Sequence, residues 1–217
     1  MRKSFKILTS VLLVLCIVFS AALPSFAKDE KTNSVNDEVV TMYLCATANS
    51  LTGHVWLYFE NLTNRNLELG YAVLNPHGAM CVGSLPNTLK DGGGTYYNAE
   101  SYMASSPEAL KAHTTSMKVN LTAEQLKSVS TQIKAKNYYN LLAYNCGNFA
   151  TEIWNSVSDN HIVHIVFPAL TILLMRLKGA EKGTLYIARP EISEVFKQTD
   201  SGIVKASKES FVKSYVG

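Results

Sequence analysis

The sequence predicts an α+β fold, with strands in the first part of the chain and helices in the second. Segments rich in β-branched and apolar residues cover 39–48, 53–60 and 67–74. A capped amphipathic pattern typical of a helix begins at Thr122, and a nearly all-apolar run follows Pro168. The composition is 47% hydrophobic and 17% charged, which excludes a disordered chain. No internal repeat interrupts this order.

Residues 1–27 have the order of regions typical of a secretory signal peptide. A basic start over 1–6 precedes an apolar run over 7–22, and the small residues Ser25 and Ala27 suit cleavage after position 27. An uncleaved membrane anchor is the alternative, but the apolar run is short for a spanning helix. We therefore expect export and removal of this segment.

The predicted mature chain is 28–217, with a flexible leader over 28–38 and a single domain over 39–217. The formal charge of the whole chain is +3, but the first 27 residues carry three basic side chains and no acidic one. Without them the basic and acidic side chains are equal in number, so charge gives no argument for binding nucleic acid or an anionic membrane surface. We expect a secreted, extracellular or cell-wall-associated protein with no transmembrane helix in its mature chain.

Export also changes the number of cysteines. Of four in the chain, Cys16 lies in the predicted signal, which leaves Cys45, Cys81 and Cys146. Three is an odd number, so at least one thiol stays free or pairs between molecules in an oxidising compartment. A disulfide between Cys45 and Cys81 is one solution, and it leaves Cys146 free.

The predicted strands 53–60 and 67–74 are separated by a polar turn cluster, which suggests that they form a hairpin. Folding this hairpin about residues 63–64 places position 73 opposite His54, with Tyr71 and Asn75 as diagonal neighbours. A further short strand is expected near 80–84.

Helices dominate the second part of the chain. The spacing of Thr122 and Gln125 is that of a capping box, and the helix it opens should run to about Lys136. A second helix is expected from about Asn145 to Ser158. A third covers 168–177 and is too short to span a bilayer. The tail from residue 185 should be a weak strand followed by polar structure.

Cys146 is the first candidate for chemistry, because it opens the second predicted helix within the sequence Tyr-Asn-Cys-Gly-Asn-Phe. Backbone N–H groups and the dipole at a helix N-terminus stabilise a thiolate, and they can also stabilise an oxyanion on an attacked carbonyl. A buried structural cysteine is the alternative, since cysteine is among the most buried residue types.

His54 is the second candidate, in the sequence Gly-His-Val-Trp at the start of a predicted strand. A histidine there could act as general base to a thiol across the fold. A structural histidine is again the alternative. His161 and His164 have helical spacing, but no ligand pattern completes a metal site around them, so we expect neither metal nor cofactor.

Together, the Gly-His-x-Trp segment on an early strand and the Tyr-Asn-Cys-x-x-Phe-Ala segment on a late helix resemble the circularly permuted branch of NlpC-type papain-like proteins. The segments 82–87 and 96–100 look like a subgroup of secreted proteins from Gram-positive bacteria. The likeness covers roughly residues 51–168. It implies a papain-like fold, with an antiparallel sheet packed on the helix that bears the cysteine.

The resemblance implies that Cys146 is the nucleophile and His54 its general base. It also implies a third, polar residue that orients His54, and the neighbouring strand offers no histidine for this role. Tyr71 is the preferred candidate, while Asn75 and the nearby His77 are alternatives.

Three residues beside the two motif positions are the expected substrate contacts: Tyr144, Asn145 and Trp56. The implied function is a secreted thiol hydrolase that cleaves an amide of a cell-wall peptide, or a related acyl bond, through a thioacyl intermediate on Cys146. The alternative is a binding or regulatory module that keeps the papain-like scaffold without turnover.

Overall fold

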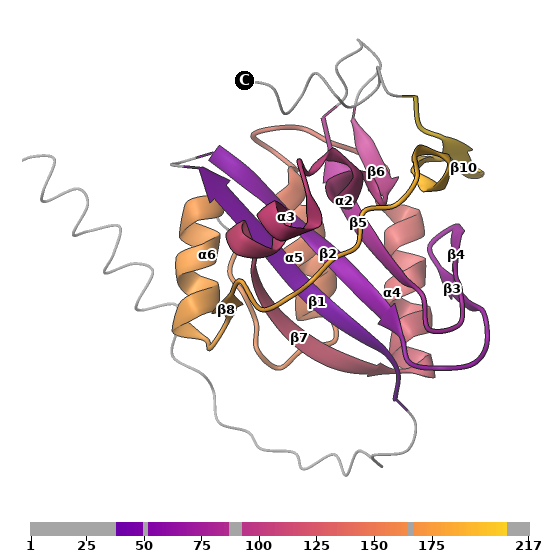
Figure 1. Cartoon of the computed structure of the whole chain (residues 1–217), viewed down its shortest axis with the longest axis horizontal. Coiled ribbons are helices and arrows are strands. Elements are labelled where there is room, and N and C mark those ends of the chain that lie inside the picture. Colours follow the sequence, from indigo (N-terminus) through magenta and orange to yellow (C-terminus); the bar gives the residue numbers. More distant parts are fainter. Residues whose placement is uncertain (1–37, 50–51, 87–92, 165–166, 208–217) are drawn as a thin grey trace, which may run out of the picture. The chain divides into compact units, whose positions relative to one another are not determined.

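An antiparallel sheet of eight strands forms the centre of the structure, which is a computed structural model (Figure 1). It describes residues 38–49, 52–86, 93–164 and 167–207. The predicted signal peptide and the leader, apart from Glu38, lie outside these residues. The described residues all belong to one compact unit, which covers 36–217.

The large sheet contains β1 (Glu38–Asn49), β2 (Thr52–Asn61), β5 (Ala79–Leu85), β6 (Gly94–Tyr97), β7 (Thr115–Thr122), β8 (Glu181–Lys182), β9 (Phe196–Thr199) and β10 (Gly202–Lys205). Its strand order is β10-β9-β6-β5-β2-β1-β7-β8. A separate small sheet pairs β3 (Leu67–Leu69) with β4 (Ala72–Leu74). The helices are α2 (Ala99–Met103), α3 (Pro107–His113), α4 (Ala123–Ala135), α5 (Cys146–Asn155) and α6 (Pro168–Leu177), with a 3-10 turn at Ile192–Glu194.

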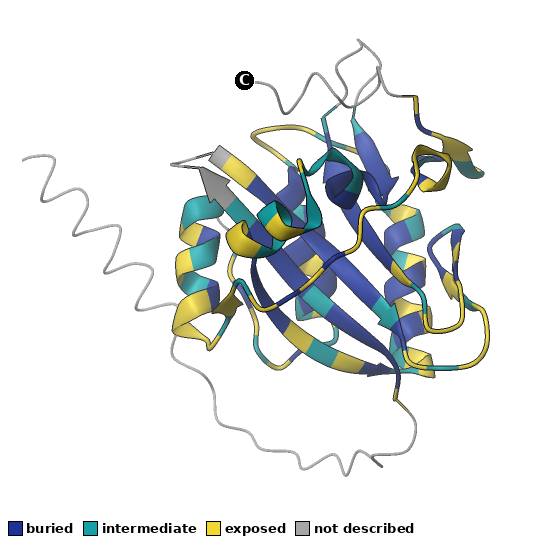
Figure 2. Ribbon diagram, in the orientation of Figure 1, coloured by how far each residue is buried: buried dark blue, intermediate teal, exposed yellow. Residues whose placement is uncertain are grey.

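Side chains along β2 point alternately to the two faces of the sheet. Val55, Leu57 and Phe59 point into the main hydrophobic core, which α4, α5 and α6 complete. His54 and Trp56 alternate with them and therefore point to the opposite face, where α2 and α3 lie. Figure 1 views the sheet from this second face, with α2 and α3 in front and α5 behind, and Figure 2 shows that its central strands are buried. The sheet is thus covered on both sides around His54.

The α+β class predicted from the sequence is confirmed, and so are three of the predicted helices. α4 begins with the expected capping box, in which the side chains of Thr122 and Gln125 each bond the other's backbone N–H. α5 and α6 begin where expected, at Cys146 and Pro168. The sequence analysis missed β7 and the short α3. Within the described residues, no helix is both long and apolar enough to cross a bilayer.

The predicted hairpin between 53–60 and 67–74 is wrong. β2 pairs with β5 instead, with Leu57 opposite Val82, and the segment 67–74 folds back on itself as β3 and β4. The reason lies at Gly70, whose φ of 60° is left-handed and makes a tight turn in the middle of the predicted strand. Tyr71 consequently sits in this turn and has no cross-strand relation to His54.

The Cys45–Cys81 disulfide is also contradicted, because both residues are free thiols. Cys45 of β1 lies opposite Trp56, and Cys81 of β5 lies opposite Tyr58, so β2 runs between the two cysteines. Strands in a sheet are about 4.8 Å apart, which puts these Cα atoms about 9.6 Å apart or more, beyond the roughly 7 Å limit for a disulfide.

Gly70 provides a test of this packing. A Cβ at position 70 would overlap the Tyr97 hydroxyl and lie 2.7 Å from Cγ2 of Ile133, in addition to straining the left-handed backbone. We expect Gly70→Ala to lower the free energy of unfolding by about 3 kcal/mol in urea denaturation. Gly179→Ala is the matched control, because Gly179 also has a left-handed φ of 88° but its Cβ would meet nothing within 4 Å. It should cost about 1 kcal/mol, and equal losses in the two variants would contradict the overlap.

Candidate active site

Cys146 is the first residue of α5, and the helix start that presents it is well defined. The Asn145 side chain accepts a hydrogen bond from the Gly147 N–H at 2.9 Å, and the Asn148 side chain accepts one from the Asn145 N–H at 2.9 Å. This reciprocal cap satisfies two backbone donors that a helix start leaves free. The Cys146 side chain is thereby held at the positive end of the helix dipole, and the residue is 7% exposed.

The imidazole of His54 meets this thiol across the sheet. β2 and β5 are hydrogen-bonded only from Leu57–Val82 onward, so they part near His54 and Val55. Cys146 fits at this point. Its sulfur is hydrogen-bonded to the His54 ring and accepts the backbone N–H groups of Val55 and Gly147. The structure therefore brings together the two residues on which the sequence analysis centred, although 92 positions separate them.

Glu100 of α2 occupies the other side of the His54 ring. Its Oε1 lies 3.0 Å from His54 Nε2, and both side chains are almost completely buried. Since Nε2 is engaged by the carboxylate, Nδ1 is the ring nitrogen left for the thiol. Trp56 stacks on the imidazole, with ring centroids 5.7 Å apart and planes 10° from parallel. Cys146, His54 and Glu100 form a nucleophile–base–orienter arrangement.

The approach of Glu100 to His54 depends on Gly83 of β5. A Cβ at this position would overlap Glu100 Oε1 and lie 3.2 Å from His54 Nε2. Only a residue without a side chain leaves room for the carboxylate to bond the imidazole. Gly83 is therefore part of the architecture of the site.

Asn98 fixes the start of α2 and with it the position of Glu100. Its backbone is left-handed, with φ of 62°, a conformation that asparagine tolerates better than most residues. Its side chain accepts a hydrogen bond from the Cys81 N–H and donates one to the Glu194 carbonyl, both at 3.1 Å. These bonds tie the first turn of α2 to β5 and to the segment that precedes β9.

The charges of the site favour a thiolate–imidazolium pair. Burial alone would lower the pKa of His54, but its charge interaction and hydrogen bonds with Cys146 and Glu100 raise this pKa to about 10. Burial alone would likewise raise the pKa of Cys146, yet the His54 charge, the His54 hydrogen bond and the two backbone N–H groups outweigh it and lower that pKa. Both shifts favour transfer of the thiol proton to His54 near neutral pH.

The pKa values of the other two described cysteines shift in the opposite direction. Burial raises the pKa of Cys45 and of Cys81, and the nearby Glu100 carboxylate raises both further. They lie in a small apolar cluster with Trp56 and Tyr58. Of the three described cysteines, Cys146 alone has a lowered pKa.

The prediction that Tyr71 orients His54 is not met, because Glu100 takes that position. The Tyr71 hydroxyl donates to the Asp200 carbonyl at 3.4 Å, and its backbone N–H donates to the Tyr97 hydroxyl at 3.2 Å. The alternatives are also elsewhere. Asn75 accepts hydrogen bonds from Asn61 and Gly78 through its carbonyl, and the His77 ring bonds the Asn64 side chain. None of the three is the residue that bonds His54, because the predicted hairpin does not form.

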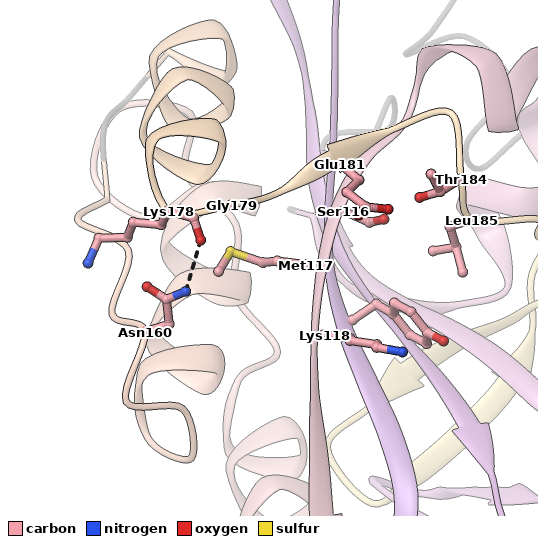
Figure 3. A pocket seen from close by; sticks show the side chains of 10 residues that line it. Ser116, Met117, Lys118, Asn160, Lys178, Gly179, Glu181, Thr184 and Leu185 are labelled. Carbon is pink, nitrogen blue, oxygen red and sulfur yellow. Dashed lines mark hydrogen bonds between the residues drawn. The ribbon is translucent and has the colours of Figure 1, made fainter.

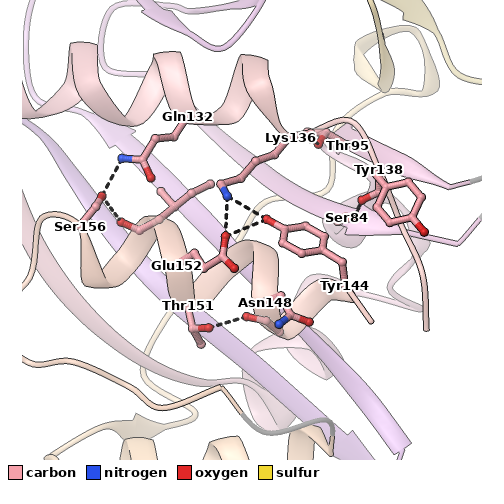
Figure 4. A network of polar contacts seen from close by, with 12 residues as sticks. Ser84, Thr95, Gln132, Lys136, Tyr138, Tyr144, Asn148, Thr151, Glu152 and Ser156 are labelled. Atoms are coloured by element: carbon pink, nitrogen blue, oxygen red, sulfur yellow. Dashed lines mark hydrogen bonds and ion pairs between the residues drawn. The ribbon is translucent and has the colours of Figure 1, made fainter. Parts of the chain in front are cut away.

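Two of the predicted substrate contacts have polar partners inside the protein. Asn145 caps α5 and also donates to the Leu141 carbonyl. The Tyr144 hydroxyl lies between Lys136 Nζ, at 2.9 Å, and a Glu152 carboxylate oxygen, at 3.1 Å, and so helps to join α4 to α5 (Figure 4). Contact of these residues or of Trp56 with a substrate stays a prediction.

His164 lies beside the candidate site, whereas His161 is exposed. A Cβ on Gly147 would be 2.8 Å from His164 Nδ1, so the imidazole packs against the first turn of α5. Burial lowers the pKa of His164, which favours its neutral form. In the part of the chain that the structure describes, no three histidine, cysteine or acidic residues gather as a metal-binding group.

One cavity adjoins the candidate site, and a larger one lies apart from it. One of about 80 Å³ is lined by His54, Glu100 and Trp56, on the α2–α3 face of the sheet. It has room for water, although not for a peptide. A larger cavity, of about 520 Å³, lies at the β7–β8 edge and contains none of the three site residues (Figure 3).

Comparison with known proteins adds no relative to this description. No protein-family model matches the chain, and neither the curated proteins nor the solved structures give a significant match. The family resemblance therefore rests on the motifs around His54 and Cys146, and the functional argument rests on the geometry of the site.

Proposed function

We propose that the protein is a thiol hydrolase of papain-like type, with Cys146 as nucleophile, His54 as acid–base and Glu100 as the residue that orients His54. The buried Cys146–His54–Glu100 arrangement is the observation that carries this proposal. An antiparallel sheet with a cysteine-bearing helix packed against it, and a histidine strand that precedes that helix in the chain, also agree with the permuted papain-like order.

The first half of the reaction follows from the charge state of the pair. The Cys146 thiolate attacks the carbonyl carbon of an amide and forms a tetrahedral oxyanion beside the N-terminus of α5, whose dipole stabilises negative charge. The C–N bond then breaks, and the His54 imidazolium gives its proton to the departing amine. The acyl group remains as a thioester on Cys146, and His54 is neutral.

The second half regenerates the enzyme. Neutral His54 accepts a proton from water, and the resulting hydroxide attacks the thioester carbonyl. Collapse of this intermediate releases a carboxylic acid and restores the thiolate–imidazolium pair. The cavity lined by His54, Glu100 and Trp56 has room for water. Glu100 holds the imidazole in position and stabilises its cationic form through both steps.

The proposed substrate is an amide of a cell-wall peptide or a related acyl bond, and the proposed location is extracellular. The substrate is inferred from the motif resemblance. The location is inferred from the signal-peptide pattern of residues 1–27. The alternative, a binding module without turnover, drew its support from the apolar segment 168–177, as a segment that could cover the cleft or dock a partner, and from the missing residue that would orient His54. Glu100 fills that role, which favours the hydrolase. Loss of hydrolysis on replacement of Cys146 is the experiment that tests the proposal.

A further inference from the structure

Three polar side chains meet beside the turn that leads into α5. Lys136 is the residue directly after α4, Tyr144 lies two residues before Cys146, and Glu152 lies within α5. The Lys136 ammonium group donates to the Tyr144 hydroxyl at 2.9 Å, and this hydroxyl donates to the Glu152 carboxylate at 3.1 Å. Lys136 also forms an ion pair with Glu152. Figure 4 shows the three groups turned toward one another.

The turn between α4 and α5 has a well-defined shape. Asn140 and Tyr144 exchange two backbone hydrogen bonds, of 2.8 and 2.9 Å. The Asn140 side chain also accepts two backbone N–H groups within the turn, at 3.1 and 2.9 Å. The Asn145 side chain donates to the Leu141 carbonyl at 3.1 Å. These bonds join residues of the turn to one another, so they set its shape without fixing its position on the sheet.

Lys136 links this turn to the sheet, because its own backbone is bonded to β6. The Thr95 hydroxyl donates to the Lys136 carbonyl, and the Thr95 N–H donates to the Asn137 side chain at 3.3 Å. β6 pairs with β5, the strand whose Gly83 adjoins the imidazole of His54. A continuous series of hydrogen bonds therefore runs from the sheet through Lys136 to the turn before the nucleophile.

We propose that Lys136 is a positioning residue: through Tyr144 it holds the nucleophile against the imidazole of His54. Cys146 is the first residue of its helix, and helix ends fray, so its position depends on the turn that precedes it. Charge interactions weaken with distance, and a displaced thiol loses part of the stabilisation that His54 gives its ionised form. This inference deepens the proposed function, and it rests on that function for the expected change in hydrolysis.

The proposal gives Tyr144 a role other than the substrate contact predicted from the sequence. A phenol hydroxyl has one proton to donate, and that of Tyr144 is donated to Glu152 inside the protein. Burial lowers the pKa of Lys136, but hydrogen bonds and charge interactions with Glu152 and Tyr144 outweigh it and raise this pKa. Lys136 is therefore cationic near neutral pH, and the three groups stay joined.

The pH dependence of Cys146 alkylation by iodoacetamide tests the proposal in the chain 28–217, which contains the whole compact unit. Lys136→Met removes the ammonium group and keeps the aliphatic stem, whereas Tyr144→Phe removes the hydroxyl without changing the charge near neutral pH. We expect each variant to react about tenfold more slowly than the parent at about pH 6. The value of kcat/KM for hydrolysis should fall by a similar factor. The double variant should lose about as much as either single one, because both act through the same hydroxyl.

Lys134→Met is the matched control, because Lys134 also lies on α4 and makes the same kinds of contact. It forms an ion pair with Glu68 and lies 5.3 Å from the centroid of the Tyr71 ring. Lys136 lies at the same distance from the centroid of the Tyr144 ring. The partners of Lys134 belong to β3 and its turn rather than to the turn before α5, so this variant should be alkylated as the parent is.

Circular dichroism establishes that each variant is folded. The proposal is overturned if Lys136→Met and Tyr144→Phe keep the pH profile of the parent, or if Lys134→Met shifts it equally. It is also overturned if only one of the first two variants shifts the profile, because the effect then does not pass from Lys136 through Tyr144. A rise in KM for Tyr144→Phe with unchanged alkylation would instead make Tyr144 a substrate contact.

The two measurements separate this proposal from the proposed function. Alkylation needs no substrate, so a parent chain that does not hydrolyse amides contradicts the proposed function and leaves the positioning role to be decided by the pH profiles. Hydrolysis by the parent together with unchanged profiles in the variants contradicts the positioning role alone.

Discussion

Replacing Cys146 with alanine is expected to lower the release of amino groups from cell-wall material by about 10³-fold or more. The thiolate supplies the electron pair that attacks the amide carbon, and no other described cysteine can replace it. The remaining acceleration should come from substrate binding and oxyanion stabilisation alone. The measurement compares new amino groups released from purified cell walls by the chain 28–217 and its variant.

Cys45→Ala is the matched control for this substitution. It removes another buried free thiol, whose raised pKa excludes a thiolate near neutral pH. Hydrolysis should survive in this variant if the protein is folded. Equal release by the parent chain and by Cys146→Ala would show that hydrolysis does not pass through this thiol, and the hydrolase proposal would then be wrong.

Gly83→Ala is expected to have the next largest effect, because it separates Glu100 from His54. The added Cβ would overlap Glu100 Oε1 and lie 2.9 Å from its Cδ, so the carboxylate must move. His54 then loses both its orientation and the hydrogen bond that helps to raise its pKa. Displacement of a catalytic group by about 1 Å costs about 10²-fold in rate, and we expect kcat/KM to fall by this amount.

Gly202→Ala is the control for Gly83→Ala, because a Cβ at Gly202 would meet nothing within 4 Å. It should leave kcat/KM unchanged. Glu100→Gln keeps the shape of the side chain while removing its charge, and it should lower activity without the overlap. If Gly83→Ala keeps full activity in a folded protein, Glu100 is not required at its observed distance from His54.

The sequence predicted the parts of the site that depend on local structure. The capped start of α5 requires only Asn145 and Asn148 on either side of the cysteine, and a helix start of this kind is visible in the residue order. The strand that carries His54 is likewise visible in its apolar composition. These local patterns selected Cys146 and His54 as candidates, and the family resemblance implied their roles as nucleophile and base.

Glu100 was missed because its role depends on long-range pairing. It lies 46 positions from His54, on a five-residue helix that has no periodic signal of its own. The two meet only because β5, rather than the segment 67–74, pairs with β2. The left-handed Gly70, which lies at the turn between β3 and β4, was overlooked in the predicted hairpin. The same error placed Tyr71 beside His54.

The prediction of a Cys45–Cys81 disulfide was wrong for a related reason. Cys45 and Cys81 belong to the same apolar cluster, but they do not form the predicted disulfide. Strand order, which the sequence did not specify, placed β2 between them. β7 was missed because its polar residues concealed the alternation of Met117, Val119 and Leu121, which face the core.

The pH dependence of Cys146 alkylation tests the thiolate–imidazolium pair most directly, and it needs no knowledge of the substrate. Iodoacetamide reacts with the thiolate form, so the rate at Cys146, followed by mass spectrometry of the folded chain, reports the fraction ionised at each pH. A lowered pKa means that this form persists as the pH falls below the ordinary thiol value of about 8.5. We predict substantial alkylation of Cys146 at about pH 6, with Cys45 and Cys81 unmodified. A rate at Cys146 that rises only above about pH 8.5, as for an ordinary thiol, would contradict the pair.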